Sequence, residues 1–457
     1  MRQYSYDGLE QILKVNQEYL SSSSKDKTET YDKCNWIITR VIQGLSFNDK
    51  LKDKADRYYV NISSSDLKKY LGTRDYKTII SLLIQARIVK SNDKYSTGNF
   101  SKSYCLTNNA FERKLIEVEV ASESFKNRLL KIAEKDFIET NSDPLLKKVL
   151  DNTAKLIIVE QDSYYKDKLL DLTEEEMDND IDPEDKLKER TQQYYRYKIF
   201  YEEFKFLNEN TSAFELFKSK VYQSPTIAKS GRIYHTASSI PRHIRRSMRV
   251  VGGHYIWEVD MSAAQPTLLM LEWLKTGGLD SAEHGLCLSL ILKGELYHYI
   301  QNNSQYFKAL EYSTLKKESL QALYEPNTKS ERNQALYSLF PLFMNWINKL
   351  KRKDYRIASH IGQSLEAKIF VEVYRNLPDD IFALIIHDSI LCLESQTSII
   401  KQKLIDRTIE LFSFLKEASD LTALFKTSLV SIKNEELLKN KNVRLLAEYL
   451  KRKQADS

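Results

Sequence analysis

The second half of the chain carries apolar patterns that predict short strands and longer helices. Four short apolar runs predict buried strands: residues 257–261, 381–386, 390–393 and 425–432. Residues 356–377, with apolar side chains four positions apart, and residues 397–415 predict helices. The first two runs end at or beside an aspartate, Asp260 and Asp388. Two such strands side by side would bring both carboxylates to one site.

The N-terminal part has a pattern of its own. It predicts, in order, a helix around residues 36–42, an extended segment at 59–62, a helix capped by residues 63–66 and ending at Gly72, a helix at 76–89, and two short strands at 88–90 and 103–107. This order resembles a winged helix-turn-helix, whose 76–89 helix would enter the major groove. The duplex contacts expected from it are Arg74, Lys77, Lys94 and Lys102, the last two on the wing. Winged helices also serve as protein-docking modules, and that alternative stays open.

Long charged helices are predicted in the region that follows. They cover residues 125–139, 144–159 and 186–208, and Pro144 stands at a favoured first-turn position. An acidic run at 171–185 separates the last two helices. Runs of one charge are typical of solvated linkers, so a linker is expected there.

Composition narrows the class of protein. The 457 residues suffice for two or three domains, and 42% apolar with 29% charged is ordinary for a globular protein. The four cysteines are scattered without metal spacing, so neither a zinc site nor a disulfide framework is expected. The N-terminal residues lack the apolar core of a signal peptide, and no apolar stretch approaches the ~18 residues of a membrane span. We therefore expect a cytoplasmic protein without a membrane partner. The net charge of +6 is too mild to identify a partner.

The distribution of basic residues says more than their total. Six cations stand between positions 229 and 249, just before Asp260: Lys229, Arg232, Arg242, Arg245, Arg246 and Arg249. Such a strip suits the phosphates of a nucleic acid backbone. A solvated basic face is the ordinary alternative, but the short distance in sequence to Asp260 favours the phosphate interpretation.

The two aspartate-bearing stretches resemble motifs of a known family. Residues 259–266, Val-Asp-Met-Ser-Ala-Ala-Gln-Pro, resemble motif A of the family A nucleic-acid polymerases, and residues 386–389, Ile-His-Asp-Ser, resemble their motif C. The basic strip is similar to the Thr-Gly-Arg and Ile-Arg-Arg segments that precede motif A in that family. The resemblance covers roughly residues 225–435.

This resemblance implies nucleotidyl transfer assisted by two metal ions. Asp260, the Met261 carbonyl and Asp388 would bind two Mg²⁺ or Mn²⁺ ions, since hard cations take oxygen ligands. The implied primer-template contacts are Arg232, Arg242, Arg245, Arg246, Gln363 and His387. Gln265 would lie under the nucleotide, where DNA polymerases of the family carry a Glu that excludes ribose. Because Gln keeps the size of Glu but loses its charge, the choice of sugar stays open.

Motif B of the family places a Lys eight positions before a Tyr on a helix beside the incoming nucleotide. Lys329 and Tyr337 have this spacing, and residues eight apart lie about 80° apart around a helix. We therefore expect Lys329 to assist catalysis, and Lys329, Arg332 and Tyr337 to bind the nucleotide, with Tyr337 packed against Gln265. An alternative register pairs Arg332 with Phe340.

The expected fold class is α+β: a right-hand polymerase with palm, fingers and helical thumb, preceded by a winged helix-turn-helix. The expected parts are a DNA-binding domain at 1–110, a thumb-like region at 111–224 with the linker 171–185, palm and fingers at 225–440, and a basic tail at 441–457. The expected function is that of a DNA polymerase without a proofreading exonuclease, serving a phage, plasmid or other mobile element. Its partners would be primer-template DNA, nucleoside triphosphates and other replication proteins. A single-subunit RNA polymerase and a catalytically weak DNA-binding replication protein are the alternatives.

Overall fold

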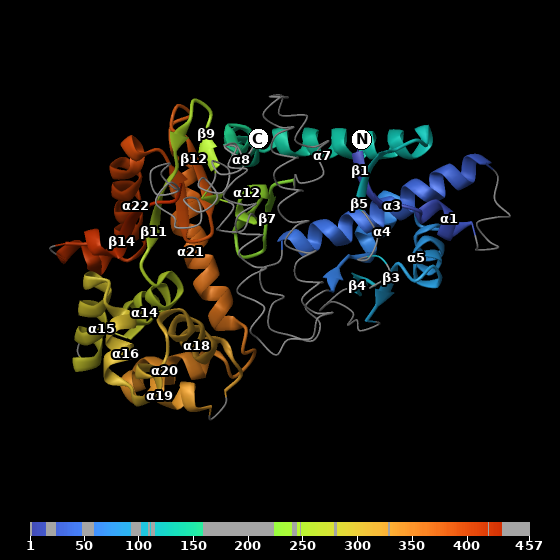
Figure 1. The fold of residues 1–457 in the computed structure, drawn as a ribbon. Helices are drawn as coiled ribbons and strands as arrows, with labels where there is room; N and C mark the ends of the chain where they lie inside the picture. Colours follow the sequence, from blue (N-terminus) through green and yellow to red (C-terminus); the bar gives the residue numbers. More distant parts are fainter. Residues whose placement is uncertain are drawn as a thin grey trace, which may run out of the picture. The chain divides into compact units, whose positions relative to one another are not determined.

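The structure is a computed structural model of the chain. It describes residues 2–14, 24–47, 59–92, 102–107, 110, 115–158, 224–239, 245–246, 248–277, 281–327, 330–418 and 420–431. The fold mixes many helices with small sheets. The described residues fall into two compact units, one within Met1–Ser224 and Ser239–Gly253, the other within Pro225–Ser238 and His254–Ser431 (Figure 1). Among these described residues, no helix is both long and apolar enough to cross a membrane.

The first unit is built around the long helix α3. Its elements are β1 (Arg2–Tyr6), α1 (Leu9–Leu13), α3 (Ser24–Phe47), β2 (Val60–Asn61), α4 (Ser64–Leu71), α5 (Tyr76–Gln85), β3 (Val89–Ser91), β4 (Ser103–Leu106), β5 (Leu115–Glu119), α7 (Glu123–Ser142), α8 (Pro144–Thr153), β6 (Leu156–Ile158) and β9 (Met248–Val250). The apolar side of α3, with Ile38 and Val41 fully buried, faces the core of the unit.

Several contacts in the first unit join residues before position 110 to residues after it. Strand β1 pairs antiparallel with β5. The Asp32 carboxylate on α3 accepts hydrogen bonds from the N–H groups of Ala121 and Ser122 at 3.0 and 2.6 Å. Lys69 on α4 forms an ion pair with Asp136 on α7 at 2.9 Å. The expected boundary at residue 110 therefore lies within this unit. Three other predicted segments lie outside the described residues: the 186–208 helix, the acidic run 171–185 and the tail 441–457.

The helices α4 and α5 and the sheet β2-β4-β3 follow the predicted order of elements. Ser63 caps α4, because its Oγ accepts the N–H of Asp66 at 3.0 Å, as a serine before an apolar run predicts. Helix α5 ends at Gln85 and not at residue 89. Arg87 has a positive φ of 54°, a conformation that cannot continue a right-handed helix.

The second unit holds a four-stranded antiparallel sheet of order β12-β13-β11-β14. Its strands are β11 (Trp257–Met261), β12 (Ala383–Ile386), β13 (Ser389–Cys392) and β14 (Phe425–Leu429), and its flanking helices are α21 (Ile357–Arg375) and α22 (Thr397–Leu411). The two helices pack beside each other, α21 against β12 and β13, α22 against β11 and β14. On β11 the two-residue period of a strand buries Val259 and Met261 and turns Glu258 and Asp260 to the other face, where both are half-buried. The strands and helices predicted here are confirmed to within a few residues.

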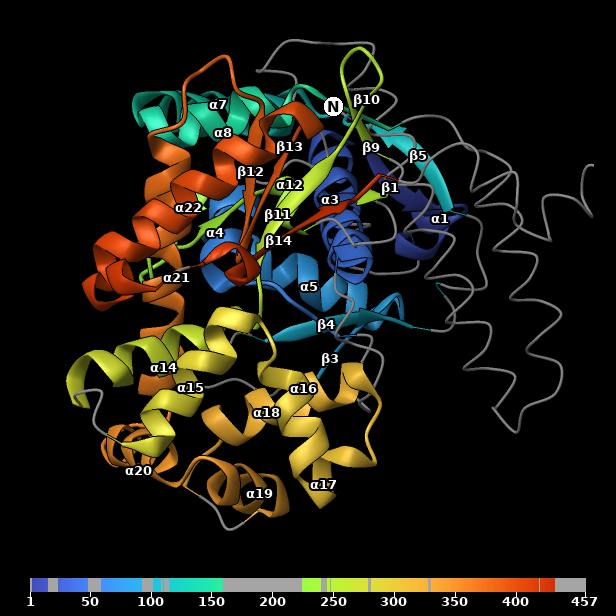
Figure 2. The ribbon, with the colours of Figure 1, turned by 90° about the vertical axis from the view of Figure 1, so that its left-hand side faces the viewer.

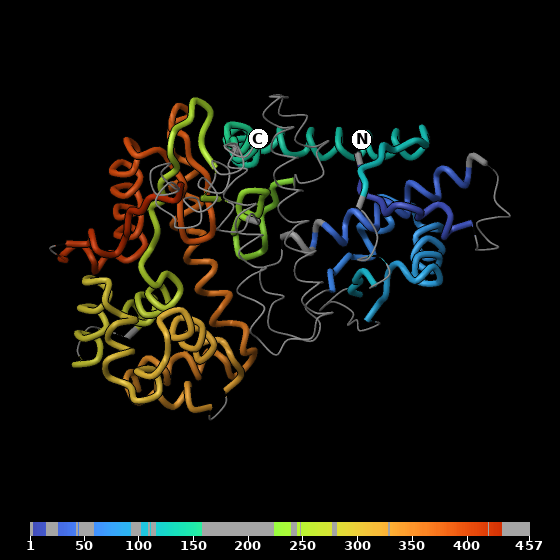
Figure 3. Tube along the Cα trace, in the orientation of Figure 1, coloured from blue at the N-terminus to red at the C-terminus, as the bar shows by residue number. Residues whose placement is uncertain are grey.

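Between β11 and β12 the chain enters a helical region and returns along α21 (Figure 2, Figure 3). The helices are α14 (Ala264–Gly277), α15 (Ala282–Lys293), α16 (Leu296–Asn303), α17 (Gln305–Lys308), α18 (Tyr312–Tyr324), α19 (Glu331–Leu339) and α20 (Pro341–Leu350). Shorter elements of the unit are β7 (Thr226–Ile227), β8 (Ile233–Tyr234), α12 (Thr236–Ser239), β10 (His254–Tyr255), η3 (Glu394–Gln396), η4 (Ser413–Glu417) and η5 (Thr422–Leu424). Helix α21 contacts α14, α18 and α20, so it links this helical region to the sheet.

Candidate active site

The two aspartates found from the sequence lie on strand β11 and in the β12–β13 turn. Asp260 on β11 stands directly opposite Ser389, and Asp388 immediately precedes Ser389. The N–H of Met261 donates to the Asp388 carbonyl oxygen at 3.2 Å, so the two backbones are hydrogen-bonded at this point. The two predicted strands are not adjacent, because β13 lies between β11 and β12, and Asp388 approaches the end of β11 from the β12–β13 turn.

Two non-glycine residues with positive φ lie near the aspartates, one directly before Asp388 and one three positions after Asp260. His387, with φ 52°, occupies the tight turn between β12 and β13, which the Ile386–Ser389 pair closes. Ala263, with φ 50°, follows β11. Such a conformation costs roughly 1–3 kcal/mol and persists where the surrounding structure determines it, often at functional sites. The His387 ring lies edge-on to Tyr234 at 5.5 Å between centroids.

The Asp388 carboxyl is in a partly buried, charged environment. Burial raises its pKa, and the nearby Glu258 carboxylate raises it further, whereas Arg232 and Lys316 lower it. A carboxylate with this environment gains from any further cation placed beside it, because the cation offsets both burial and like-charge repulsion.

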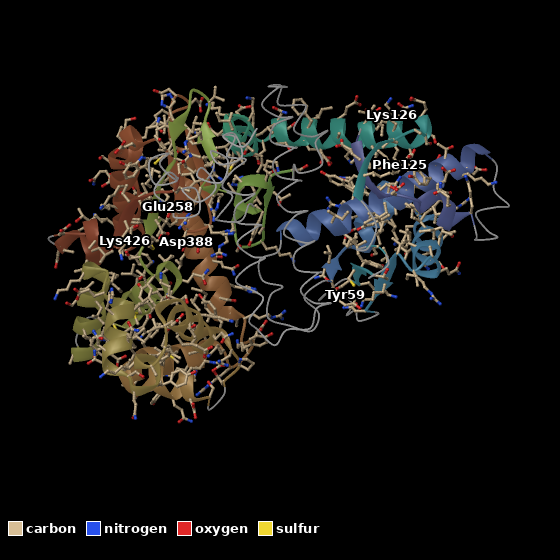
Figure 4. The ribbon with its side chains drawn as sticks, in the orientation of Figure 1. Tyr59, Phe125, Lys126, Glu258, Asp388 and Lys426 are labelled. Atoms are coloured by element: carbon tan, nitrogen blue, oxygen red, sulfur yellow. The ribbon has the colours of Figure 1, made fainter. Side chains whose placement is uncertain are left out.

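The exposed face of β11 carries further charged side chains. Glu258 lies on the same face as Asp260, and its carboxylate accepts a hydrogen bond from Ser428 on β14 at 3.0 Å. Lys426 on β14 stands opposite Asp260 in the strand register and is exposed. Figure 4 labels Glu258, Asp388 and Lys426 around this part of the sheet. The face therefore offers several oxygen ligands with a lysine beside them.

The aspartate pair is the part of this face that suits a metal ion. In the portion of the chain that the structure describes, no three His, Cys, Asp or Glu side chains form a metal-binding group. A Mg²⁺ ion usually needs only one or two protein carboxylates, and takes its other ligands from water and substrate phosphates. Asp260 near the end of β11 and Asp388 in the hydrogen-bonded β12–β13 turn are both half-buried, which fits that requirement. Met261 is buried at the end of β11.

A buried polar network stands beside the aspartates and connects three helices. The Tyr324 hydroxyl on α18 donates to Oε1 of Gln265 on α14 at 2.5 Å. Nε2 of Gln265 donates to Oε2 of Glu366 on α21 at 3.5 Å, and Arg232 donates to the same oxygen. Glu366 is only 1% exposed. Burial raises its pKa to about 7, although the Arg232 charge and hydrogen bond lower it.

The network identifies the aromatic partner of Gln265 as Tyr324, and the expectation of Tyr337 was wrong. Tyr337 is 40% exposed, and its hydroxyl donates to Asn345 at 3.4 Å. Burial raises the pKa of Tyr324, as expected of a phenol enclosed beside a carboxylate. The spacing of eight that motif B requires recurs from Lys316 to Tyr324.

Lys316 is an exposed residue of α18 whose charge acts on Asp388. Its ammonium lies 4.6 Å from the ring centroid of Tyr312 and 5.7 Å from that of Tyr297, and its charge lowers the pKa of Asp388. Sequence reasoning missed this lysine, although its spacing to Tyr324 was present as a signal. The two candidate registers have the same spacing, and only the contact of Tyr324 with Gln265 separates them.

Arg332 and Phe340, from the motif B registers predicted from the sequence, make contacts unlike those of Lys316 and Tyr324. Arg332 forms ion pairs with Glu318 at 2.8 Å and Glu325 at 2.9 Å, so it ties α19 to α18. Phe340, from the alternative register, is fully buried. Lys329 lies outside the described residues.

The other predicted site residues are distributed over both units. Gln363 is half-buried on α21, and Arg232 and His387 belong to the second unit with it. Arg245 and Arg246 belong to the first unit, as do the exposed Arg74, Lys77 and Lys102. Arg242 and Lys94 lie outside the described residues.

Comparisons with known proteins leave the family open. No model of a known protein family matches the sequence, and no curated protein is significantly similar to it.

Proposed function

We propose that the protein is a nucleotidyltransferase that extends a nucleic acid strand: a template-directed DNA polymerase that resembles family A and lacks a proofreading exonuclease. The observation that carries the proposal is the backbone contact between β11, which bears Asp260, and the β12–β13 turn, which bears Asp388. Support comes from Lys316 and Tyr324, which have the motif B spacing, and from the contact of Tyr324 with the motif A residue Gln265.

Each residue of the site then has a role that its chemistry allows. Asp260 and Asp388 would hold two Mg²⁺ or Mn²⁺ ions, which would activate the 3′-hydroxyl and stabilise the charge on the phosphates. Lys316 would neutralise the triphosphate, since its positive charge acts on the Asp388 carboxyl. His387, held in the strained turn beside Asp388, would hydrogen-bond the primer end.

The first unit would serve as a duplex-binding module. Its α4, α5 and β2-β4-β3 sheet follow the order of a winged helix-turn-helix. Arg74 and Lys77, exposed at the start of α5, would contact phosphates and so orient the duplex.

A single-subunit RNA polymerase is the second candidate. The His387-Asp388-Ser389 sequence favours it, because the phage-type RNA polymerases carry His-Asp-Ser at motif C, and Gln265 lacks the charge that DNA polymerases use against ribose.

Primer extension by the full-length protein tests the proposal and separates these candidates. Reactions with dNTPs or rNTPs, each with Mg²⁺, Mn²⁺ or EDTA, should show metal-dependent extension with dNTPs preferred. Preference for rNTPs without a primer would favour the RNA polymerase, and no incorporation under any condition would contradict both.

A further inference from the structure

The acid that motif A lacks at position 265 is present nearby on another element. Glu366 on α21 is fully buried, and its Oε2 accepts hydrogen bonds from Arg232 and from Nε2 of Gln265. Tyr324 donates to the other end of the same amide, Oε1 of Gln265. A carboxylate and a phenol therefore hold the two ends of one carboxamide.

Hydrogen-bond chemistry fixes the direction of this amide. An ionised carboxylate only accepts hydrogen bonds, so the NH₂ group of Gln265 faces Glu366 and its oxygen faces the Tyr324 hydroxyl. The reversed amide would place two acceptors together at Glu366. Gly362 leaves room for the arrangement, since a Cβ there would lie 3.2 Å from the Tyr324 hydroxyl and 3.8 Å from Cβ of Gln265.

Burial of the Glu366 carboxyl group costs folding free energy. Its second oxygen, Oε1, is buried without a hydrogen-bond partner among the described residues. A buried acceptor without a partner destabilises the folded protein, and such acceptors in native structures often belong to functional groups. Here the other oxygen of the same carboxylate binds Arg232 and Gln265. Around the carboxyl stand Arg232 before β8, Gln265 on α14 and Tyr324 on α18, and the Asp388 charge acts on it from the β12–β13 turn.

We propose that Glu366 is the positioning residue that sets which sugar the nucleotide site accepts. This inference rests on the function proposed above. By holding Gln265 in one orientation, Glu366 keeps the Gln265–Tyr324 pair closed under the sugar. A 2′-hydroxyl fits only if one of these hydrogen bonds breaks, so the site prefers deoxyribonucleotides without an acidic residue in motif A itself.

The test measures kcat/KM for a dNTP and for the matching rNTP in single-nucleotide primer extension by the full chain. Glu366→Gln should lower the dNTP/rNTP ratio by about tenfold or more, because the amide of Gln265 then loses its charged partner. Gln265→Glu alone should disturb the site, since it places two carboxylates together. The double variant Gln265→Glu/Glu366→Gln rebuilds a carboxylate–amide pair in reverse and should restore the ratio to within roughly threefold of wild type.

The control is Glu372→Gln, the same substitution at a partly exposed position of α21, which should leave the ratio unchanged. A purely structural role for Glu366 would lower kcat/KM equally for both sugars, and that result would overturn the inference, as would a failure of the double variant to restore the ratio. If Glu366→Gln does not fold, the double variant alone decides. Absence of all incorporation by the wild type would instead overturn the proposed function, and the inference with it.

Discussion

Burial of Glu366 makes the free energy of unfolding depend on the protonation of its carboxyl group. Its pKa rises from the ordinary 4.5 to about 7 in the folded protein. Below pH 4.5 the carboxyl is protonated in the folded and unfolded chains alike, whereas between 4.5 and about 7 only the folded chain keeps the proton. The free energy of unfolding therefore falls as the pH rises through this interval, by up to about 3 kcal/mol.

Glu366→Gln should remove this pH dependence. Urea unfolding at about pH 5 and about pH 8 measures the free energy of unfolding of both proteins. The value for the variant minus that for the wild type should be about 2–3 kcal/mol larger at about pH 8 than at about pH 5. Glu372→Gln is the control, since it lies on the same helix but is partly exposed. A stability difference that is the same at both pH values would show that Glu366 is ionised throughout.

At the residue scale the sequence reveals some members of the site and hides others. Asp260 and Asp388 can be predicted, because an aspartate at the end of a β-branched run is a local pattern. Glu366 cannot be predicted, because an acidic residue on an amphipathic helix ordinarily lies on the solvated face. Here α21 packs against α14, and Glu366 is buried. Lys316 and Lys329 each have an aromatic residue eight positions later, so spacing alone cannot choose between them.

Helix α18 is the element on which the nucleotide-binding proposal depends. Its end is held by the buried Lys351, which donates to the carbonyl oxygens of Ala322 and Glu325 at 3.4 and 3.1 Å. A cation at this end also complements the helix dipole. These hydrogen bonds join the end of α18, next to Tyr324, to the end of α20.

Lys316→Ala should raise KM for the nucleotide about tenfold or more, because one charge-assisted contact to the triphosphate is lost. Lys317→Ala, the neighbouring exposed lysine on the same helix, is the matched control. Lys329→Ala tests the original register in the same assay of steady-state incorporation. A larger effect at Lys329 than at Lys316 would return motif B to that register.

Element boundaries agreed with the sequence at several local signals, but the prediction of one helix at 144–159 was wrong: α8 ends at Thr153, and strand β6 follows it. The cap at Ser63 and the period of 356–377 are such signals, and α21 was observed at Ile357–Arg375. The end of α5 was missed because a positive φ at Arg87 has no marker in the sequence. The pairing of β1 with β5 was missed because it joins segments far apart in the chain.

At the scale of the whole molecule, the contacts of the first unit define a fragment for study. Because β1 pairs with β5 and α7 is bonded to α3 and α4, a fragment of residues 1–153, which ends before β6 and so does not need its partner β9, should fold, whereas 1–110 would lose these contacts. We predict that this fragment binds duplex DNA with an affinity that falls steeply with salt, since counterions are released from the phosphates.

In the same fragment, Lys77→Ala should weaken binding to all sequences alike and lower the slope of log affinity against log salt by about one. Lys126→Ala, on α7, is the control for a general loss of charge, and Figure 4 labels this residue. Fluorescence anisotropy at several salt concentrations measures both effects. A folded fragment without affinity even at low salt would assign this unit to protein docking.

Primer extension with isosteric variants tests most directly whether Asp260 and Asp388 together make a nucleotidyl-transfer site. Asp260→Asn and Asp388→Asn should each lower metal-dependent incorporation roughly 10²- to 10³-fold or more, because each removes a charge that the metal ions require. Asp380→Asn, at an exposed position before β12, should extend like the wild type. Circular dichroism and thermal unfolding should show all three variants folded. Near wild-type extension by either Asp260→Asn or Asp388→Asn would show that the two carboxylates do not form the nucleotidyl-transfer site.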